Sequence, residues 1–279
     1  MKFVSYEHLG GIKVGAIKDN GIVDLSDVGT SLREMLSFGP LDNLIKLVET
    51  REPNVDLDKV ILHPVIPNAG RIICVGRNYH QHVKELGNDL PEHPYLFLRT
   101  TQSVVGHRQS LIKPNVSEQY DFEGELGVII GRGGRYISSE SAFTHIAGYT
   151  CFLDGTLRDY QKHSFAAGKN FDSSGSCGPW LIPAHDIPDP QSLQISTYIN
   201  GKIMQNANTS EMIFSIAYLI EYISLFTHLE VGDIIATGTP SGVGAGRKPP
   251  IWLMPGDSVE VEIENVGTLS NIVKSELNV

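Results

Sequence analysis

The sequence contains little cysteine. Its 279 residues include three cysteines, Cys74, Cys151 and Cys177, which are too few and too scattered for a disulfide framework or a thiolate zinc site. An odd number is typical of a reducing compartment, so we expect a cytoplasmic protein. Cys177 lies in a Gly-Ser-Cys-Gly-Pro stretch, where we expect a small buried thiol and treat a nucleophile as the alternative.

Long hydrophobic runs are also missing. The longest apolar-rich stretch, residues 212–226, is interrupted by Glu221 and is shorter than the ~20 residues that cross a bilayer. At the N-terminus, Glu7 and His8 occur before any apolar core of signal-peptide length develops. We therefore expect neither a secretory signal nor a membrane partner.

Positive charge is scarce. There are 22 Lys and Arg residues against 32 Asp and Glu residues, which gives a formal net charge of -10. Such a balance argues against binding to a nucleic-acid backbone or to an anionic membrane surface. We therefore do not expect a nucleic-acid partner.

The motifs of two large enzyme classes are absent. The sequence has no P-loop pattern and no Gly-x-Ser-x-Gly nucleophile elbow, so it supports neither an NTPase nor an α/β-hydrolase. Residues 242–247 are glycine-rich, but Pro249 and Pro250 block the helix that a dinucleotide-binding fingerprint requires. We interpret this segment as a loop.

Glycine and proline, in contrast, are plentiful. The 28 glycines and 15 prolines are spread along the chain, which predicts short strands joined by tight turns and a mostly β fold of the α+β class. Asp19-Asn20-Gly21 between apolar runs predicts a hairpin. The prolines within residues 63–68 suit neither a helix nor a central strand. We place a domain boundary there, with a small α+β domain at 1–66 and a larger domain at 67–279.

Helices are expected at four places. Ser31 followed by Glu34 is typical of a capping box at the start of a short helix, and residues 41–48 suggest a second one. Residues 79–86 predict a short helix that Gly87 ends. The longest helix is predicted over residues 210–226, where apolar residues recur every three or four positions.

Two glutamates suggest a metal site. Glu123 and Glu125 are two residues apart, so a strand would direct both to one face, and the apolar run after Glu125 leads that strand into the core. Neighbouring buried anions need a cation. Asp154, at the end of another apolar segment, completes a set that suits Mg²⁺ or Mn²⁺, with Ca²⁺ as a further hard cation. The alternative is a solvated strand edge, and the pattern leaves both interpretations open.

His82 and Glu85 form a second candidate group. If their segment is helical, the two residues are three positions apart and face the same way. The carboxylate then orients the imidazole and raises its basicity, as in a general-base pair. The alternative is an ordinary solvated helix face.

Taken together, these segments and several others resemble the fumarylacetoacetate hydrolase family, and in particular its acylpyruvase and fumarylpyruvate hydrolase-like branch. The matching motifs lie in the family's order over residues 71–279. They are Gly76-Arg77-Asn78-Tyr79 with His82 and Glu85; Asp121-Phe122-Glu123-Gly124-Glu125-Leu126; Asp154 with Arg158-Asp159-Tyr160-Gln161; Gly168-Lys169-Asn170-Phe171-Asp172; Gly178-Pro179-Trp180; and residues 237–244.

The resemblance implies a mixed β-sandwich roll, a homodimer and a divalent metal on Glu123, Glu125 and Asp154. It also implies that Lys169 lies beside metal and substrate, and that His82 and Glu85 activate water. The substrate contacts that it implies are Arg77, Tyr79, Gln161, Gly238 and Thr239. Arg77 and Arg99 are candidates for holding a second substrate carboxylate, with a structural role as the alternative for each.

The leading hypothesis is a metal-dependent hydrolase that cleaves the C–C bond of an acylpyruvate or related 2,4-dioxo acid and releases pyruvate. The first alternative is a decarboxylase or isomerase of a 2-oxo acid such as oxaloacetate on the same scaffold. Both reactions pass through an enolate that positive charge stabilises. From a different class, a noncatalytic module that binds metal or a small molecule is the third hypothesis.

Overall fold

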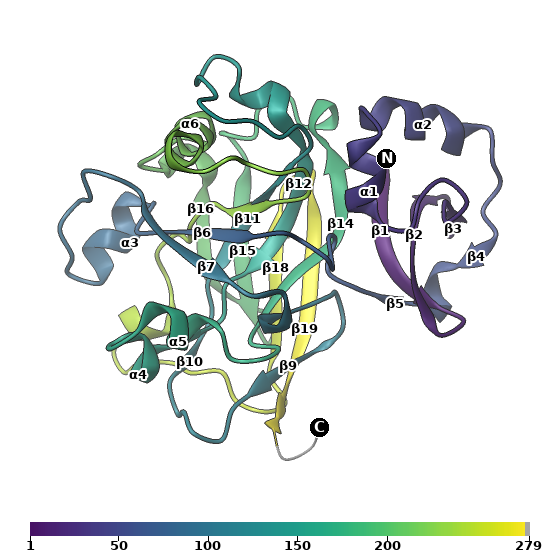
Figure 1. Ribbon diagram of the computed structural model, residues 1–279. Coiled ribbons are helices and arrows are strands. Elements are labelled where there is room, and N and C mark those ends of the chain that lie inside the picture. The colour runs from purple at the N-terminus through teal and green to yellow at the C-terminus, as the bar shows by residue number, and fades with distance from the viewer. Residues whose placement is uncertain (277–279) are drawn as a thin grey trace.

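A 12-stranded mixed sheet extends from the N-terminal strands, at the right of Figure 1, through the centre of the protein. The structure, a computed structural model, describes residues 1–276. The path of the sheet is β4-β3-β2-β1-β14-β12-β11-β17-β6-β7, with β5 beside β1 and β8 beside β14. Its strands are β1 (Lys2–His8), β2 (Gly11–Lys18), β3 (Gly21–Asp24), β4 (Val55–Asp56), β5 (Ile61–Leu62), β6 (Ile72–Gly76), β7 (Tyr95–Arg99), β8 (Val104–Val105), β11 (Gly124–Ile130), β12 (Ile146–Leu153), β14 (Gly175–Pro183) and β17 (Ile234–Ala236).

A five-stranded sheet packs against this centre, and a two-stranded pair lies beside the site. The five strands, in spatial order, are β16 (Lys202–Asn208), β15 (Gln194–Ile199), β18 (Ser258–Ile263), β19 (Gly267–Ser275) and β9 (Ser110–Lys113), and the pair is β10 (Tyr120–Asp121) with β13 (Thr156–Leu157). The two large sheets meet closely at Gly124, where a methyl group would lie 3.2 Å from Val261. Glycine between the two glutamates therefore permits the close packing of β11 on the second sheet.

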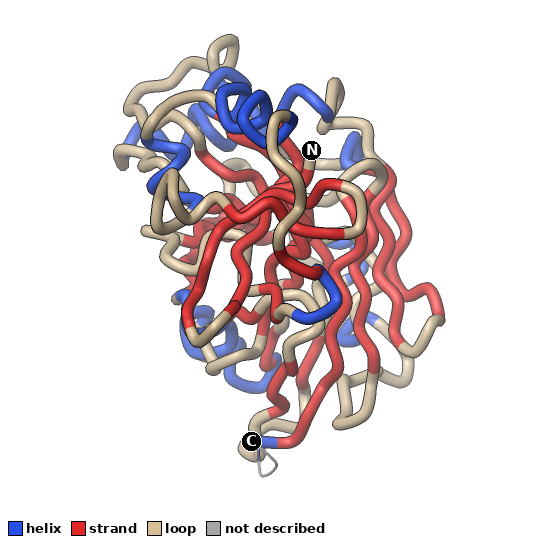
Figure 2. The backbone as a smooth tube through the Cα atoms, turned by 90° about the vertical axis from the view of Figure 1, so that its right-hand side faces the viewer, coloured by secondary structure: helices blue, strands red, loops and turns tan. Residues whose placement is uncertain are grey.

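Helices lie at the ends and edges of the strands, whereas strands fill the middle (Figure 2). The α-helices are α1 (Leu32–Ser37), α2 (Leu41–Glu49), α3 (His80–Glu85), α4 (Arg158–Gln161), α5 (Phe165–Lys169) and α6 (Ile216–Phe226), and the 3₁₀ turns are η1 (Leu57–Lys59), η2 (Thr101–Ser103), η3 (Ala142–His145), η4 (Ala184–Asp186), η5 (Thr209–Glu211) and η6 (Gly244–Gly246). No helix among residues 1–276 is both long and apolar enough to span a membrane.

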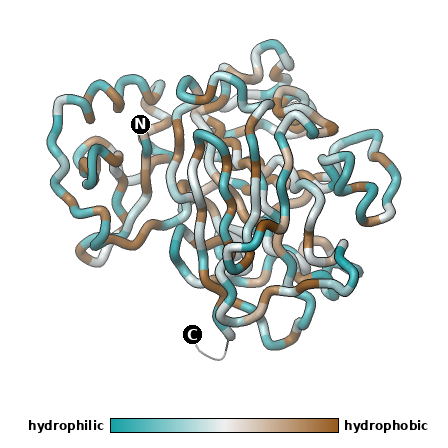
Figure 3. The backbone as a smooth tube through the Cα atoms, turned by 180° about the vertical axis from the view of Figure 1, so that it is seen from behind, coloured by the Kyte–Doolittle hydropathy of each residue, from teal (hydrophilic) through white to brown (hydrophobic). Residues whose placement is uncertain are grey.

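The mostly β fold predicted from the sequence is confirmed. Hydrophobic residues recur along the central strands in Figure 3, whereas the outer loops are largely hydrophilic. In β11 every residue is buried, so this strand has apolar neighbours on both faces. In β18 buried and more exposed residues alternate, as expected for a strand with one solvated face.

In the N-terminal segment, the hairpin and the first helix form where the local sequence predicts them. Residues 19 and 20 join β2 to β3 as the predicted hairpin, and the Ser31 hydroxyl accepts a hydrogen bond from the Glu34 N–H at the start of α1. The capping box is incomplete, because the Glu34 carboxylate binds Thr30 instead. β1 pairs with β14, which joins this segment to the central sheet. The boundary after residue 66 stays a prediction.

The longest helix is shorter than predicted. We expected a helix over residues 210–226, but α6 begins at Ile216. Asn78 is the reason: its backbone carbonyl accepts the N–H of Ile213, and its side-chain oxygen accepts the N–H of Phe214 at 2.7 Å. Ser215 then caps the helix by accepting the N–H of Tyr218. Contacts with a segment far away in the sequence thus set the helix start.

Candidate active site

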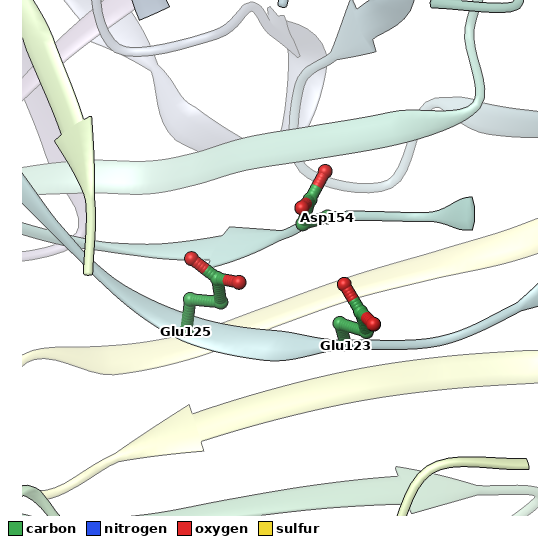
Figure 4. Close-up of side chains that lie close together, drawn as sticks. All are labelled: Glu123, Glu125 and Asp154. Carbon is green, nitrogen blue, oxygen red and sulfur yellow. The ribbon is translucent and has the colours of Figure 1, made fainter. Parts of the chain in front are cut away.

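Three carboxylates meet where β11 begins and β12 ends. Glu125 lies on β11, Glu123 lies two residues earlier, and Asp154 directly follows β12, the antiparallel neighbour of β11. The N–H of Asp154 donates to the carbonyl of Glu123 at 2.8 Å, which fixes the two segments side by side. Figure 4 shows Glu123 and Glu125 extending from the same side of their segment toward the segment that carries Asp154.

The three carboxylates are buried and close together. The residues are 5%, 2% and 1% exposed in the order Glu123, Glu125 and Asp154, and one oxygen from each lies within 4.8 Å of the others. This group is not the solvated strand edge that the sequence left open as an alternative. Its burial makes the balance of charge around it decisive, because an uncompensated buried anion is costly.

Cations compensate two of the three carboxylates. Lys169, at the end of α5, donates its Nζ to Glu123 and to Asp154 Oδ2, the latter at 2.5 Å. Arg158 Nη2 donates to Glu123 Oε1 at 2.5 Å, and Arg99 Nη1 donates to Asp154 Oδ1 at 2.6 Å. Glu125 accepts the N–H of Gly238 at 2.9 Å, but within residues 1–276 it forms no ion pair with Lys or Arg.

The pKa shifts differ between the carboxylates that have cationic partners and the one that has none. Burial favours the neutral form of Glu123, but Arg158 and Lys169 outweigh it and hold the pKa of Glu123 well below its usual range. Burial, together with Asp154 and Glu123, raises the pKa of Glu125 well above its usual range. Burial alone would lower the pKa of Lys169, yet Asp154 and Glu123 raise it, so Lys169 stays an ammonium ion.

These residues fit a divalent cation. The donors are carboxylate oxygens, which hard ions such as Mg²⁺, Mn²⁺ and Ca²⁺ prefer, whereas a zinc site more often contains His or Cys. Glu125 is buried and, unlike Glu123 and Asp154, forms no ion pair with Lys or Arg within residues 1–276, and a divalent ion would supply the missing positive charge. Glu123, Glu125 and Asp154 are therefore the residues that would hold the metal.

Local sequence places Lys169 beside the triad. Ser164 caps α5 by accepting the N–H of Ala167 at 3.1 Å. Its own N–H donates to the carbonyl of Tyr160 on α4 at 3.1 Å, which holds the start of α5 close to α4. A methyl group at Gly168 would lie 2.6 Å from the Cα and Cβ atoms of Gln161. Glycine at this position thus lets α5 approach α4, and the approach brings Lys169 and Gln161 to the same site.

His82 and Glu85 lie one turn apart on α3. His82 is 4% exposed, and its Nδ1 lies 3.5 Å from Glu85 Oε2. No atom among residues 1–276 forms a hydrogen bond with this Nδ1. Because catalytic hydrogen bonds are often long before substrate binds, the distance suits a carboxylate that orients the imidazole. Asn78 fixes the start of α3, since its amide nitrogen donates to the Thr237 carbonyl at 2.7 Å.

A cavity of about 260 Å³ opens onto this group. The predicted site residues that line it are Arg77, His82, Glu123, Glu125, Asp154, Gln161, Lys169 and Thr239. Tyr79, Glu85 and Gly238 are not among the lining residues. Tyr79 is 1% exposed and belongs to the main hydrophobic core, Glu85 lies beside His82, and Gly238 donates its N–H to Glu125.

Arg99 was a candidate for a substrate carboxylate, with a structural role as the alternative; it reaches Asp154 from β7 and does not line the cavity. Two further contributors were not predicted as site residues from the sequence. Arg158 bridges Asp121 and Glu123. A wall of the cavity is aromatic, with Phe97 and Phe165 among the lining residues. Arg158 could have been found from the sequence, because buried acids need compensating cations and Arg158 lies in the same motif as Gln161.

A family model described as fumarylacetoacetate (FAA) hydrolase C-terminal matches residues 71–274. The chain therefore belongs to the fumarylacetoacetate hydrolase family, as its motifs predicted. Among relatives, oxaloacetate tautomerase YisK of Bacillus subtilis (strain 168) is 40% identical over 299 residues, which cover 97% of this chain and 99% of the relative. The mitochondrial oxaloacetate tautomerase of Bos taurus is 35% identical, over 98% of this chain and 91% of the relative.

Solved structures share the fold across the whole chain. Maleylpyruvate hydrolase from Sphingobium sp. SYK-6, in complex with a manganese(II) ion and pyruvate, superposes with a TM-score of 0.83 at 26% identity. The match covers 99% of each chain. A manganese complex in a structural neighbour and the buried acidic triad both indicate divalent metal binding.

Proposed function

We propose that this protein is a metal-dependent tautomerase that interconverts the enol and keto forms of a 2-oxo dicarboxylic acid such as oxaloacetate. The observation that carries the proposal is one cavity lined by a histidine with a carboxylate partner, a buried ammonium and an acidic triad. Tautomerisation needs a group that moves a proton and positive charge that stabilises an enolate. Tautomerisation is an isomerisation, and a decarboxylase or isomerase of a 2-oxo acid was the first alternative hypothesis from the sequence.

The positive charge comes from two sources. A Mg²⁺ or Mn²⁺ ion held by Glu123, Glu125 and Asp154 would stabilise the enolate by charge. Lys169 adds a fixed ammonium, because its acidic neighbours keep it protonated. Gln161 accepts a hydrogen bond from Arg158 Nη1 through its amide oxygen at 2.9 Å, which leaves its amide nitrogen to donate to a substrate oxygen.

The proton step belongs to His82. In the enol-to-keto direction, the enol hydroxyl loses a proton and C3 gains one, so no net proton enters or leaves. His82 takes up one proton and returns one, and Glu85 stabilises the imidazolium between the two transfers. Burial of His82 keeps bulk water from the same proton.

The second carboxylate of the substrate has two cations available. Arg77 and Lys162 line the cavity, and within residues 1–276 neither forms an ion pair with a carboxylate; Lys162 Nζ donates to the amide oxygen of Gln119 at 3.5 Å. Arg77 lies over the Tyr95 ring at 5.7 Å and has a φ of 58°, a conformation that glycine adopts at lower cost. An arginine at a strained position beside a cavity suits a ligand-binding role.

Hydrolysis of an acylpyruvate remains the second candidate, because the same histidine and carboxylate suit the activation of water. Maleylpyruvate hydrolase among the structural neighbours favours it. The tautomerase relatives are more similar in sequence, at 40% and 35% identity, and the two unpaired cations suit a dicarboxylate. We therefore place tautomerisation first, and the noncatalytic module last.

One set of assays separates these reactions. Purified protein with Mg²⁺ or Mn²⁺ is given oxaloacetate and a panel of acylpyruvates, while enol absorbance and released pyruvate are followed together. We expect fast loss of the oxaloacetate enol signal with no matching pyruvate. Cleavage of any acylpyruvate at a higher kcat/KM would instead favour the hydrolase, and pyruvate from oxaloacetate would favour the decarboxylase.

Two variants test the assigned roles. His82→Ala should lower kcat by ~10²- to 10⁴-fold, whereas His80→Ala, an exposed histidine on the same helix, should not. Arg77→Met should raise KM for the dicarboxylate more than for a monocarboxylic 2-oxo acid. Arg108→Met is its matched control, because Arg108 also has a positive φ of 61° but does not line the cavity.

A further inference from the structure

The glycine-rich residues 242–247, here called the glycine loop, contact two carboxylates of the site. The N–H of Gly242 donates to both oxygens of Glu85, at 3.0 and 3.1 Å. The N–H groups of Gly244 and Ala245 donate to the two oxygens of Asp121, at 2.7 and 3.0 Å. The glycine loop does not match a dinucleotide-binding fingerprint, but its N–H groups bind carboxylates of the protein itself.

Glu85 also fits closely against Gly246. A methyl group at position 246 would lie 2.5 Å from Cγ of Glu85 and 2.6 Å from its Oε1, far inside normal contact distances. Gly246 has no positive φ, so its backbone does not require glycine. The space taken up by Glu85 is thus the reason for glycine at this position.

The loop is itself anchored to the second sheet. Arg247 Nη2 donates to the carbonyl of Met204 at 2.7 Å and to that of Gly242 at 3.0 Å. Asp121, held at the other end of the loop, accepts Arg158 Nε at 2.8 Å, and Arg158 continues to Glu123. One rigid loop therefore sets the position of Glu85 on α3 relative to the acidic triad.

We infer that the glycine loop positions Glu85 against His82, and that Gly246 is a positioning residue for this pair. The inference rests on the proposed role of His82 and Glu85 in proton transfer. It predicts that a methyl group at 246 displaces the Glu85 carboxylate, because the far end of this side chain moves more easily than backbone. His82 then loses its orienting carboxylate while the triad and the cavity keep their cations.

A double-mutant cycle between positions 246 and 85 tests this inference. Gly246→Ala should lower kcat by about 10²-fold through misplacement of a catalytic group, with KM and Mn²⁺ affinity unchanged. In a Glu85→Ala background the same change should have no further effect. Gly11→Ala is the control, because a methyl group there meets no atom within 4 Å. Equal losses from Gly246→Ala in both backgrounds would overturn the inference.

A second measurement needs no turnover. The Gly242 amide loses its acceptor when Glu85 moves, so Gly246→Ala and Glu85→Ala should each raise hydrogen exchange at Gly242 by about tenfold. Unchanged exchange in Gly246→Ala contradicts the inference even if the proposed reaction is correct. If His82→Ala is fully active but exchange rises as expected, the proposed reaction fails and the positioning role stands.

Folding provides the last check. If Gly246→Ala alone does not fold, adding Glu85→Ala should restore the folded state, because it removes the atoms that the methyl group meets. A double variant that remains unfolded would mean that Gly246 serves the backbone and not Glu85.

Discussion

Two segments of this protein carry glutamates at alternate positions, and their environments are opposite. Glu123 precedes β11 and Glu125 is its second residue, and this strand is buried on both faces. Glu260 and Glu262 lie on the more exposed face of β18, where their hydrogen-bond partners are the hydroxyls of Ser270 and Tyr198. The spacing of the acids is the same, so spacing alone does not define a metal site. Burial and the surrounding cations make the difference.

The largest expected effect is on activity. Asp154→Asn removes a carboxylate that would hold the metal, so we expect kcat/KM to fall by about 10³-fold or more. Glu262→Gln, the corresponding change on β18, should leave kcat/KM within about twofold, because surface substitutions rarely propagate. Steady-state kinetics at saturating Mg²⁺ compare the two. Equal losses would remove the distinction between the segments.

A smaller effect separates two members of the triad. In chelator-treated protein, Glu123→Gln leaves Arg158 and Lys169 without a shared partner, which should lower the free energy of unfolding by about 3 kcal/mol. Glu125→Gln replaces a carboxyl whose raised pKa favours the neutral form and which has no cationic partner among the described residues, so it should cost less than about 1 kcal/mol. Urea unfolding measures both. A larger loss for Glu125→Gln would contradict the assigned charge balance.

The smallest expected effect is on pH dependence. Because burial and its acidic neighbours raise the pKa of Glu125, this carboxyl keeps its proton to a higher pH than an ordinary glutamate does, and a metal ion must displace that proton. Below its raised pKa, metal affinity should therefore increase with pH, by up to about tenfold per pH unit for one released proton. Calorimetric titrations in buffers of different ionisation enthalpy count that proton. Affinity that weakens as pH rises would rule out this coupling.

Much of the fold and the core of the site could be predicted from the sequence. The apolar run after Glu125 indicated burial, and the approach of Asp154 to Glu123 followed from the second apolar segment. The hairpin at Asn20 and the helix cap at Ser31 could be predicted because a few adjacent residues determine them.

Features that depend on contacts between residues far apart in the sequence could not be predicted from it. The start of α6 at Ile216 depends on hydrogen bonds from Asn78, which lies far away in the sequence. The role of Arg99 beside Asp154 depends on how β7 reaches the site. Gly246 looked like an ordinary loop glycine, because only the folded chain brings Glu85 against it.

The central claim is that Glu123, Glu125 and Asp154 bind one divalent cation that the reaction needs. Calorimetric titration of chelator-treated protein with Mn²⁺ tests it most directly, with Glu125→Gln and Glu262→Gln titrated in parallel. The account predicts one ion per chain for the unaltered protein and for Glu262→Gln, and no saturable binding for Glu125→Gln. Undiminished binding by Glu125→Gln, or no binding by the unaltered protein, would contradict it.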